Sequence, residues 1–273
     1  MRYSAALSRA EESEFVPFMH ELIGIAFATI RPYFLSGTAV TLKGDSSPVT
    51  RADREAEAKM RLAIERRYPQ HGVIGEELGI KLGRGYRWVL DPVDGTRAFI
   101  TNAFLFGTLI ALERDDGTGF RPILGAIAHP IAGFALIGHG EATTLYAVDG
   151  SQRRVSVRAC ERLEDATVLA TTHWSTGEQR ITSDTSKIER LIERVRLYRT
   201  WGDCFGYFSL ATGGADLMLD PTLSYWDVAA IVPVVEGAGG IVSSWNGSDP
   251  LRELSLVASN SALHPLAVAA LHR

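Results

Sequence analysis

The chain has 273 residues, of which 46% are hydrophobic and 22% are charged, and its formal net charge is −4. These values are ordinary for a globular protein, and they argue against a disordered chain and against a nucleic-acid partner. No apolar run approaches the roughly 18 residues of a membrane span, and the opening MRYSAALSRAEESEF lacks the apolar core of a secretory signal. We therefore expect a cytoplasmic protein without a membrane partner. Cys160 and Cys204 form no C-x-x-C pair, so we expect two packed thiols.

Two helices are expected first. Residues 5–34 carry apolar side chains at helical spacing, and the pattern ends near Pro32. A second helical pattern begins after Thr50, an expected N-cap, and stops at Pro69. Short β-rich runs follow at 72–77, 86–90, 106–113, 123–130 and 133–140, with a turn composition at 114–119. This order predicts a sheet that follows two helices.

From about residue 141 the pattern alternates between strands and helices. Strands are expected at 166–172, 197–200, 215–220 and 241–245, and helices at 186–196, 204–213, 226–240 and 264–273. The fold class is therefore predicted to be α/β, with an α+β N-terminal subdomain (1–140) and an α/β C-terminal subdomain (141–273). No Pro- or Ser-rich linker separates them, so we expect a broad shared interface with a ligand cleft between the two.

Carboxylates lie beside apolar runs, which we expect to be buried strands, in three places. Glu76 and Glu77 end "GVIGEE", Asp91 and Asp94 lie in "WVLDPVDGT", and Asp227 lies in "SYWDVAA". Burying carboxylates is costly unless they are paired or bind a metal ion. Most of these candidate metal ligands belong to the N-terminal subdomain.

The D-P-V-D-G-T segment has features of a binding site. Pro92 does not suit the interior of a central strand, so we expect the backbone to turn there and both aspartates to project into one small volume. Hard oxygen ligands without Cys or His favour Mg²⁺. Gly95 would let a ligand approach the backbone, and Thr96 would offer a hydroxyl group to a phosphate. The alternative is an ordinary solvated turn.

Four blocks of the sequence resemble the signature blocks of the inositol monophosphatase superfamily. They are "LKGDSSPVTRAD" (42–53), "GEE" (75–77), "DPVDGT" (91–96) and "WDVAA" (226–230), in that order. The resemblance implies a layered αβαβα sandwich, a lithium-sensitive Mg²⁺-dependent phosphomonoesterase with two to three ions per site, and a homodimer.

The resemblance also implies roles for the carboxylates. Glu76, Asp91 and the backbone carbonyl of Val93 match the ligands of the first metal ion. Asp91, Asp94 and Asp227 match the ligands of the second, so that Asp91 bridges the two ions. Two metal ions would clamp the phosphoryl group for in-line attack by water.

A pair that activates the water is implied as well. Thr96, hydrogen-bonded to Asp53, matches the family's pair that orients and deprotonates the water, with Glu76 adjacent. Asp53 has a second interpretation, because it lies three residues after Thr50 and can complete a capping box. Asp227 near a helix start could likewise be only a partner of the helix dipole. Lys43 is a weaker candidate for the phosphate or metal site.

The segment 198–220 is expected to set the substrate. Asp203, next to Trp201, adds a carboxylate that would favour a substrate with an ammonium or imidazolium group. The run W-G-D-C-F-G-Y is similar to that of the superfamily's histidinol-phosphate phosphatases, and Asp220 matches the family's acidic contact to the substrate alcohol. The alternative for Asp203 is a helix N-cap whose carboxylate turns to the backbone.

Three functions remain open on the sequence. The first is hydrolysis of the phosphate monoester histidinol phosphate, and the second is a broader inositol or sugar monophosphatase. The third is a non-catalytic metal- or phosphoinositide-binding module, against which the presence of both Thr96 and Asp53 argues. The lone histidines His129, His139 and His173 are expected to be packed or at the surface.

Overall fold

Two sheets with helices on both sides make up the computed structural model, which describes residues 2–37, 40–42, 48–172 and 185–272. Lys43 and His173 lie outside the described residues. The larger sheet has eight described strands in the order β10-β9-β8-β7-β6-β5-β3-β4, and the smaller has five in the order β12-β11-β13-β15-β14. Strands β1 (Val40–Leu42) and β2 (Pro48–Thr50) form a separate antiparallel pair.

The bounds of the larger sheet's strands are β3 (Gly72–Gly75), β4 (Gly79–Lys81), β5 (Tyr86–Asp94), β6 (Gly107–Asp115), β7 (Phe120–His129), β8 (Phe134–Gly138), β9 (Thr143–Tyr146) and β10 (Gln152–Arg154). All described neighbours in this sheet are antiparallel except β3 and β5, which are parallel. The smaller sheet comprises β11 (Thr167–Ala170), β12 (Leu197–Arg199), β13 (Leu217–Asp220), β14 (Ile241–Ser243) and β15 (Leu256–Ser259). There β12, β11 and β13 are parallel, and β15 runs antiparallel to β13 and β14.

The described α-helices are α1 (Arg9–Ile30), α2 (Arg51–Arg67), α3 (Thr96–Ile100), α4 (Thr185–Ile192), α5 (Asp203–Ala211), α6 (Tyr225–Gly237), α7 (Pro250–Glu253) and α8 (His264–His272). Single 3₁₀ turns lie at Arg31–Tyr33 and Leu163–Asp165. Helix α1 starts later than the sequence predicts, because Ser8 and Glu11 form a capping box there. The preceding Ala5 instead donates its backbone N–H to the Pro122 carbonyl.

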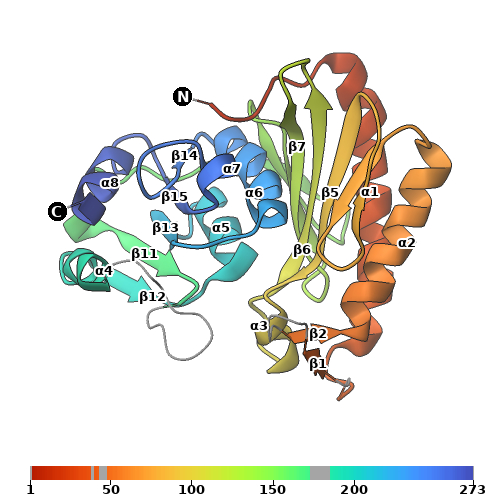
Figure 1. Ribbon diagram of the computed structural model, residues 1–273. Coiled ribbons are helices and arrows are strands. Elements are labelled where there is room, and N and C mark those ends of the chain that lie inside the picture. The colour runs from red at the N-terminus through yellow and green to blue at the C-terminus, as the bar shows by residue number, and fades with distance from the viewer. Residues whose placement is uncertain (1, 38–39, 43–47, 173–184, 273) are drawn as a thin grey trace.

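Figure 1 shows five layers: α1 and α2, the larger sheet, α5 and α6, the smaller sheet, and finally α4 with α8. Three buried apolar clusters lie between the layers, and one of them covers both sides of the α5–α6 layer. Met19, Met60 and Trp88 lie in the first, and Leu109 and Tyr207 lie in the cluster between the sheets. The third covers the outer face of the smaller sheet. The predicted α/β class and αβαβα layering are therefore confirmed.

Helix α6 lies at the centre of the molecule, and its residues from Val228 to Val235, between the buried acids Asp227 and Glu236, are all apolar and buried, as expected for a helix covered by two sheets. It contacts β5, β6, β7 and β8 of the larger sheet and β14 of the smaller one. A Cβ atom at Gly125 would lie 2.2 Å from the Ala230 carbonyl oxygen, so only glycine allows β7 to come this close to the helix. The helix thereby joins the two halves of the chain. Strands β9 and β10 continue the larger sheet to Arg154, which is past residue 140. The division of the chain into two subdomains at residue 140 stays a prediction.

Helix α1 is long and apolar enough to cross a membrane by length and composition alone, with a mean hydropathy of 1.2 in its most apolar window. This differs from the expectation that no segment is apolar enough over the length of a membrane span. In the structure 44% of that window is buried inside the protein. The buried side chains, which include Phe15, Phe18 and Leu22, pack on α2 and the larger sheet. We therefore interpret α1 as a core helix.

Candidate metal centre

The end of β5 carries a β-bulge that brings Asp91 and Asp94 together. Between the pairs Asp91↔Leu109 and Asp94↔Gly107, β5 has two residues and β6 has one. Side chains three residues apart in a regular strand point to opposite faces of the sheet. The extra residue in β5 shifts this alternation by one, so Asp91 and Asp94 can point to the same side. The sequence prediction that the strand turns away at Pro92 is wrong, because β5 continues to Asp94. The bulge accommodates the proline's missing N–H instead.

Glu76 reaches the site from the neighbouring parallel strand. Parallel strands end at the same edge of a sheet, and the register Gly75↔Leu90 places Glu76 beside Asp91. The turn that follows is held by Glu57 of α2, a fully buried carboxylate that accepts hydrogen bonds from the backbone N–H groups of Glu77 (2.8 Å) and Leu78 (3.1 Å). Glu57 was not singled out from the sequence, because an acidic residue within a charged helix reads as solvated.

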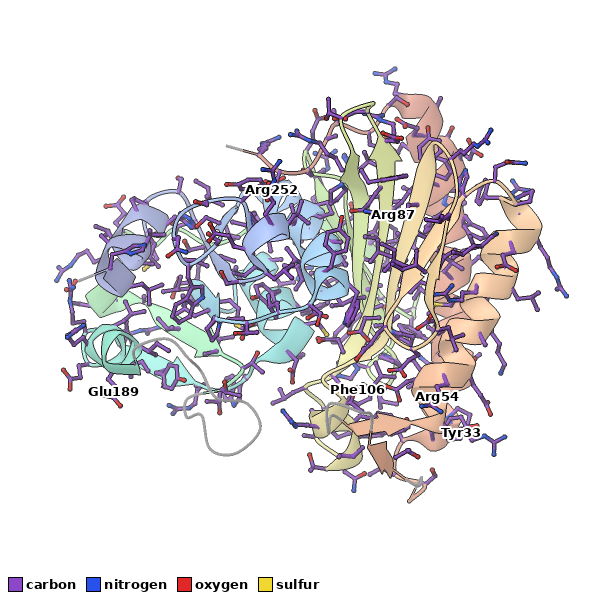
Figure 2. The ribbon with its side chains drawn as sticks, viewed as in Figure 1. Tyr33, Arg54, Arg87, Phe106, Glu189 and Arg252 are labelled. Atoms are coloured by element: carbon purple, nitrogen blue, oxygen red, sulfur yellow. The ribbon has the colours of Figure 1, made fainter. Side chains whose placement is uncertain are left out.

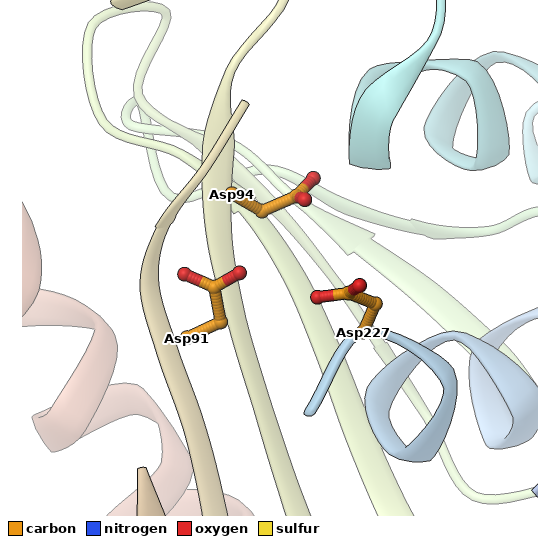
Figure 3. Close-up of side chains that lie close together, drawn as sticks. All are labelled: Asp91, Asp94 and Asp227. Carbon is orange, nitrogen blue, oxygen red and sulfur yellow. The ribbon is translucent and has the colours of Figure 1, made fainter. Parts of the chain in front are cut away.

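Asp227 joins from the other half of the chain, in the first turn of α6. Its Oδ2 accepts a hydrogen bond from the Ser224 backbone N–H at 2.8 Å, as part of a capping box that was not predicted from the sequence. In Figure 3 the carboxylates of Asp91, Asp94 and Asp227 point into one space, and their oxygens lie within 4.8 Å of one another. Glu76 is not part of this group of three, although it neighbours Asp91.

The electrostatics of this cluster suit a cation. Burial and then repulsion by Glu76, Asp94 and Asp227 raise the pKa of Asp91 well above its usual value. Burial likewise raises the pKa of Asp94, to about 6, and that of Asp227. In the described part of the chain none of the three aspartates has an ion-pair partner. Buried oxygen donors with uncompensated charge fit a hard divalent ion.

Replacing Asp94 by asparagine should therefore stabilise the metal-free protein, and increasingly so as the pH rises. The folded-state pKa of Asp94, about 6, lies above the usual 3.8. A carboxyl group of this kind binds more protons folded than unfolded, so its contribution to stability is complete below the unfolded pKa and is lost as the pH rises through about 6. The measurement is the melting temperature of both proteins in EDTA. We expect the excess of Asp94→Asn over the wild type to grow from about pH 5 to about pH 7.5. A difference that shrinks over this interval would contradict the burial of an ionisable Asp94.

The predicted water-activating pair lies next to the cluster. The Thr96 hydroxyl lies 3.5 Å from Asp53 Oδ1 and 3.1 Å from the Val93 carbonyl oxygen. The other oxygen of Asp53, Oδ2, accepts hydrogen bonds from the backbone N–H and the hydroxyl of Thr50. The capping box and the contact to Thr96 therefore coexist on the two oxygens of one carboxylate. Burial raises the pKa of Asp53, and the hydrogen bonds from Thr50 oppose that rise.

Gly95 connects this pair to the C-terminal half. Its φ of 81° is left-handed, and an added Cβ would lie 3.0 Å from Asp203 Oδ2. A residue with a side chain at position 95 would thus be both strained and in contact with the Asp203 carboxylate. The Asp203 carboxylate faces the predicted phosphate-binding turn.

Asp203 is the first residue of α5 and does not cap it. The N-cap position is occupied by Gly202, and no side chain caps the helix there. The capping alternative for Asp203 is therefore wrong. The next residue, Cys204, donates its backbone N–H to Asp94 Oδ2 at 2.5 Å, and its buried thiol also contacts Asp94. Both cysteines are free and buried, as predicted. The start of α5 thus touches a predicted metal ligand, which no sequence pattern indicated.

The other predicted substrate contacts lie around Asp203. Asp220 is 2% exposed, and its oxygens accept hydrogen bonds from the Tyr207 hydroxyl (2.8 Å) and the Thr171 backbone N–H (3.3 Å). Burial raises its pKa to about 7. The Thr171 hydroxyl accepts a hydrogen bond from the Asp203 backbone N–H at 2.9 Å, which links the two acids. Trp201 is 48% exposed. Roles in substrate binding for all three stay predictions.

The two described histidines among those singled out from the sequence differ in burial. His129 is buried, lies 2.8 Å from the Phe104 carbonyl oxygen through Nε2, and accepts the Ala132 N–H through Nδ1. Its predicted packing role is confirmed. His139 is half-buried, and its backbone N–H donates to the Ala142 carbonyl.

Comparison with known proteins agrees with this geometry. The model of the inositol monophosphatase family matches residues 11–273. The chain is 36% identical over 253 residues to the chloroplastic bifunctional phosphatase IMPL2 of Arabidopsis thaliana, covering 91% of this chain and 69% of that protein. It is 35% identical over 233 residues to a histidinol-phosphatase of Chlorobaculum parvum, covering 84% and 85%.

A solved structure is similar throughout. An inositol monophosphatase from Zymomonas mobilis superposes with a TM-score of 0.82 at 33% sequence identity, covering 98% of this chain and all of that one. Together with the sequence blocks and the layered fold, these similarities show that the chain belongs to the inositol monophosphatase family, whose members are phosphatases.

Proposed function

We propose that the protein is a Mg²⁺-dependent phosphomonoesterase that hydrolyses L-histidinol phosphate. The observation that carries the phosphatase part is the convergence of Asp91, Asp94 and Asp227 from the two halves of the chain, with oxygens within 4.8 Å of one another. Carboxylate oxygens in this arrangement are the ligands that Mg²⁺ prefers. Glu76 and the Val93 carbonyl, next to Asp91 and Thr96 respectively, are the proposed ligands of a further ion.

When bound, divalent cations make water a better nucleophile at neutral pH and neutralise charge on the phosphate ester. The protein's own groups then have three tasks. The carboxylates hold the cations, and the Gly95–Thr96 turn leaves room for the phosphate beside the backbone. Thr96 orients the attacking water and passes its proton toward Asp53, the nearby buried carboxylate. The water oxygen attacks phosphorus directly as the ester P–O bond breaks. The departing oxygen takes up a proton and leaves as the alcohol, inorganic phosphate is the other product, and no covalent phosphoenzyme is required.

The proposed substrate rests on charge. Asp203 and Asp220 add two acidic side chains beside the metal cluster. Burial raises the pKa of both, and repulsion by Asp94 adds to the rise in each. Asp220 also raises the pKa of Asp203, while Arg97 opposes that rise. An ammonium or imidazolium group would relieve this repulsion, whereas the neutral hydroxyls of inositol would not. The similarity to a histidinol-phosphatase supports the same choice. The alternative within the family is an inositol or sugar monophosphatase, which the similarity to the Zymomonas mobilis protein supports.

Phosphate release should separate these substrates. We expect Mg²⁺-dependent release from histidinol phosphate with a kcat/KM at least about 10-fold above that for inositol 1-phosphate, because one charge-assisted contact contributes about 1.5–3 kcal/mol. EDTA should abolish release, and lithium should reduce it. No turnover of any monoester with Mg²⁺ would refute the phosphatase, whereas turnover of inositol phosphate alone would refute only the substrate.

The matched variant for this assay is Asp203→Asn. It removes the charge that faces the substrate and keeps the side-chain shape. It should lower kcat/KM for histidinol phosphate and leave turnover of a neutral monoester within a few-fold of the wild type. An equal loss on both substrates would indicate that Asp203 supports the metal site and does not select the substrate.

A further inference from the structure

The first residue of α6 is tied to the larger sheet by a buried polar triad, Arg87, Glu113 and Tyr225. The Tyr225 hydroxyl donates to Glu113 Oε1 and accepts from Arg87 Nη2 at 3.0 Å. Arg87 Nε donates to Glu113 Oε2 at 2.6 Å. Arg87 lies on β5 (Figure 2), and Glu113 is its cross-strand partner on β6.

The triad is enclosed. The Glu113 side chain is fully buried, the Arg87 side chain is 22% exposed, and the guanidinium lies 4.2 Å from the centre of the Phe120 ring. Every oxygen of Glu113 has a donor, so the charge is compensated. Buried ionic groups seldom add net stability compared with apolar ones, and their best-attested use is to fix a register. The triad joins α6 to β5 and β6, so the position that it can fix is that of α6 relative to the larger sheet.

Two members of the triad lie close in sequence to two of the predicted metal ligands. Arg87 lies on the same strand as Asp91, four residues earlier and therefore on the same face of the sheet. Tyr225 lies two residues before Asp227 in the first turn of α6. A second polar link between this sheet and α6 lies near the other end of the helix, where the Thr143 hydroxyl on β9 donates to the Val234 carbonyl at 2.7 Å. The helix side chains between these two links, from Val228 to Pro233, are apolar, and their contacts are non-directional. The triad is thus a directional link between the strand that carries Asp91 and the helix turn that carries Asp227.

We propose that Arg87, Glu113 and Tyr225 are positioning residues that set the distance between Asp227 and Asp91 and so the affinity of the cluster for a divalent cation. The inference rests on the proposed function in one respect, that a cation binds between these aspartates. Without the triad, Thr143 still holds the far end of α6, but the first turn can shift along its apolar contacts, and the three carboxylates then meet the cation less well.

Tyr225→Phe tests this with the loss of one hydroxyl group. We expect the dissociation constant for Mn²⁺ or Mg²⁺, measured by titration calorimetry on the metal-free full-length protein, to rise roughly 5- to 10-fold, the effect of about one lost hydrogen bond. The Mg²⁺ concentration for half-maximal phosphate release should rise by the same factor. The kcat at saturating Mg²⁺ should stay within about 2-fold of the wild type.

The chain offers a matched control. The Tyr86 hydroxyl donates to Glu11 at 2.9 Å, and Glu11 is also bound by Arg114 at 2.8 Å, which repeats the same chemistry between β5 and α1. Tyr86→Phe should lower the melting temperature comparably and leave the metal affinity unchanged. Glu113→Gln is a second variant that should weaken metal binding in the same direction as Tyr225→Phe.

The outcomes are distinct. An unchanged dissociation constant in Tyr225→Phe, or an equal rise in Tyr86→Phe, would overturn the positioning role while leaving the proposed function intact. Absence of divalent-cation binding in the wild type would overturn the proposed function and this inference with it.

Discussion

Asp91→Asn is expected to reduce phosphate release by at least about 10³-fold. Asp91 lies in the group of three aspartates and also neighbours Glu76, so it is the ligand proposed to bridge two cations. Metal ions supply several kcal/mol of charge stabilisation in the transition state, and each 1.36 kcal/mol lost is about a tenfold decrease in rate. The measurement is kcat/KM at Mg²⁺ concentrations up to the solubility limit of the assay.

The same substitution should stabilise the metal-free protein. Burial and repulsion by three acidic neighbours disfavour the charged form of Asp91, and asparagine removes that charge. The melting temperature in EDTA near neutral pH should rise, by roughly 2–4 °C per kcal/mol of repulsion relieved. Asp149→Asn, in an exposed turn, is the control and should change neither quantity. Retention of more than about a tenth of the activity by Asp91→Asn would be incompatible with a bridging ligand.

Thr96→Val is expected to have the second largest effect, a decrease in kcat of about 10²-fold or more at saturating Mg²⁺. Valine keeps the shape of the threonine side chain but loses the hydroxyl that lies between Asp53 Oδ1 and the Val93 carbonyl. Positioned proton transfer of this kind contributes about 10²–10⁴-fold. Stopped assays of phosphate release over a range of Mg²⁺ concentrations measure the effect.

Thr96→Ser is the conservative partner of this variant. It restores the hydroxyl and should recover most of the activity, whereas the affinity for Mg²⁺ should remain within a few-fold in both variants. If Thr96→Val kept the wild-type kcat, the proton would have to leave by another route. If it lost only Mg²⁺ affinity, Thr96 would act on the metal site and not on the water.

Much of the fold and of the site was predictable because the signals are local. The apolar spacing of α1 and α2 and the alternation of strands and helices after residue 141 depend on neighbouring residues only. Asp91 and Asp94 follow an apolar run and Asp227 precedes one, and a buried carboxylate at such a position needs a partner. Their convergence could be expected once the layered fold was inferred.

What could not be predicted depends on contacts between distant segments. The β5 bulge is decided by how Pro92 meets β6, and the sequence suggested a turn instead. The edge strands β4 and β10 have only three residues each, too few to show a period. Glu57 reads as part of a charged helix surface until the turn after β3 is placed against it.

The conformation of the specificity segment is another such case. Asp203 follows a glycine at the start of a helix, which locally resembles a capping position. Its left-handed φ of 48° and the contact with Gly95 come from the approach of the two halves of the chain. The triad likewise joins Tyr225 to Arg87 and Glu113, which lie more than 100 positions earlier, so no local pattern indicates it.

The most direct test is to locate the cation itself. Crystals grown with Mn²⁺ and measured by anomalous diffraction should show a peak within about 2.0–2.3 Å of carboxylate oxygens from Asp91, Asp94 and Asp227 together. A fully active, metal-loaded protein whose anomalous peaks all lie elsewhere would contradict the assignment of these three aspartates as the metal centre.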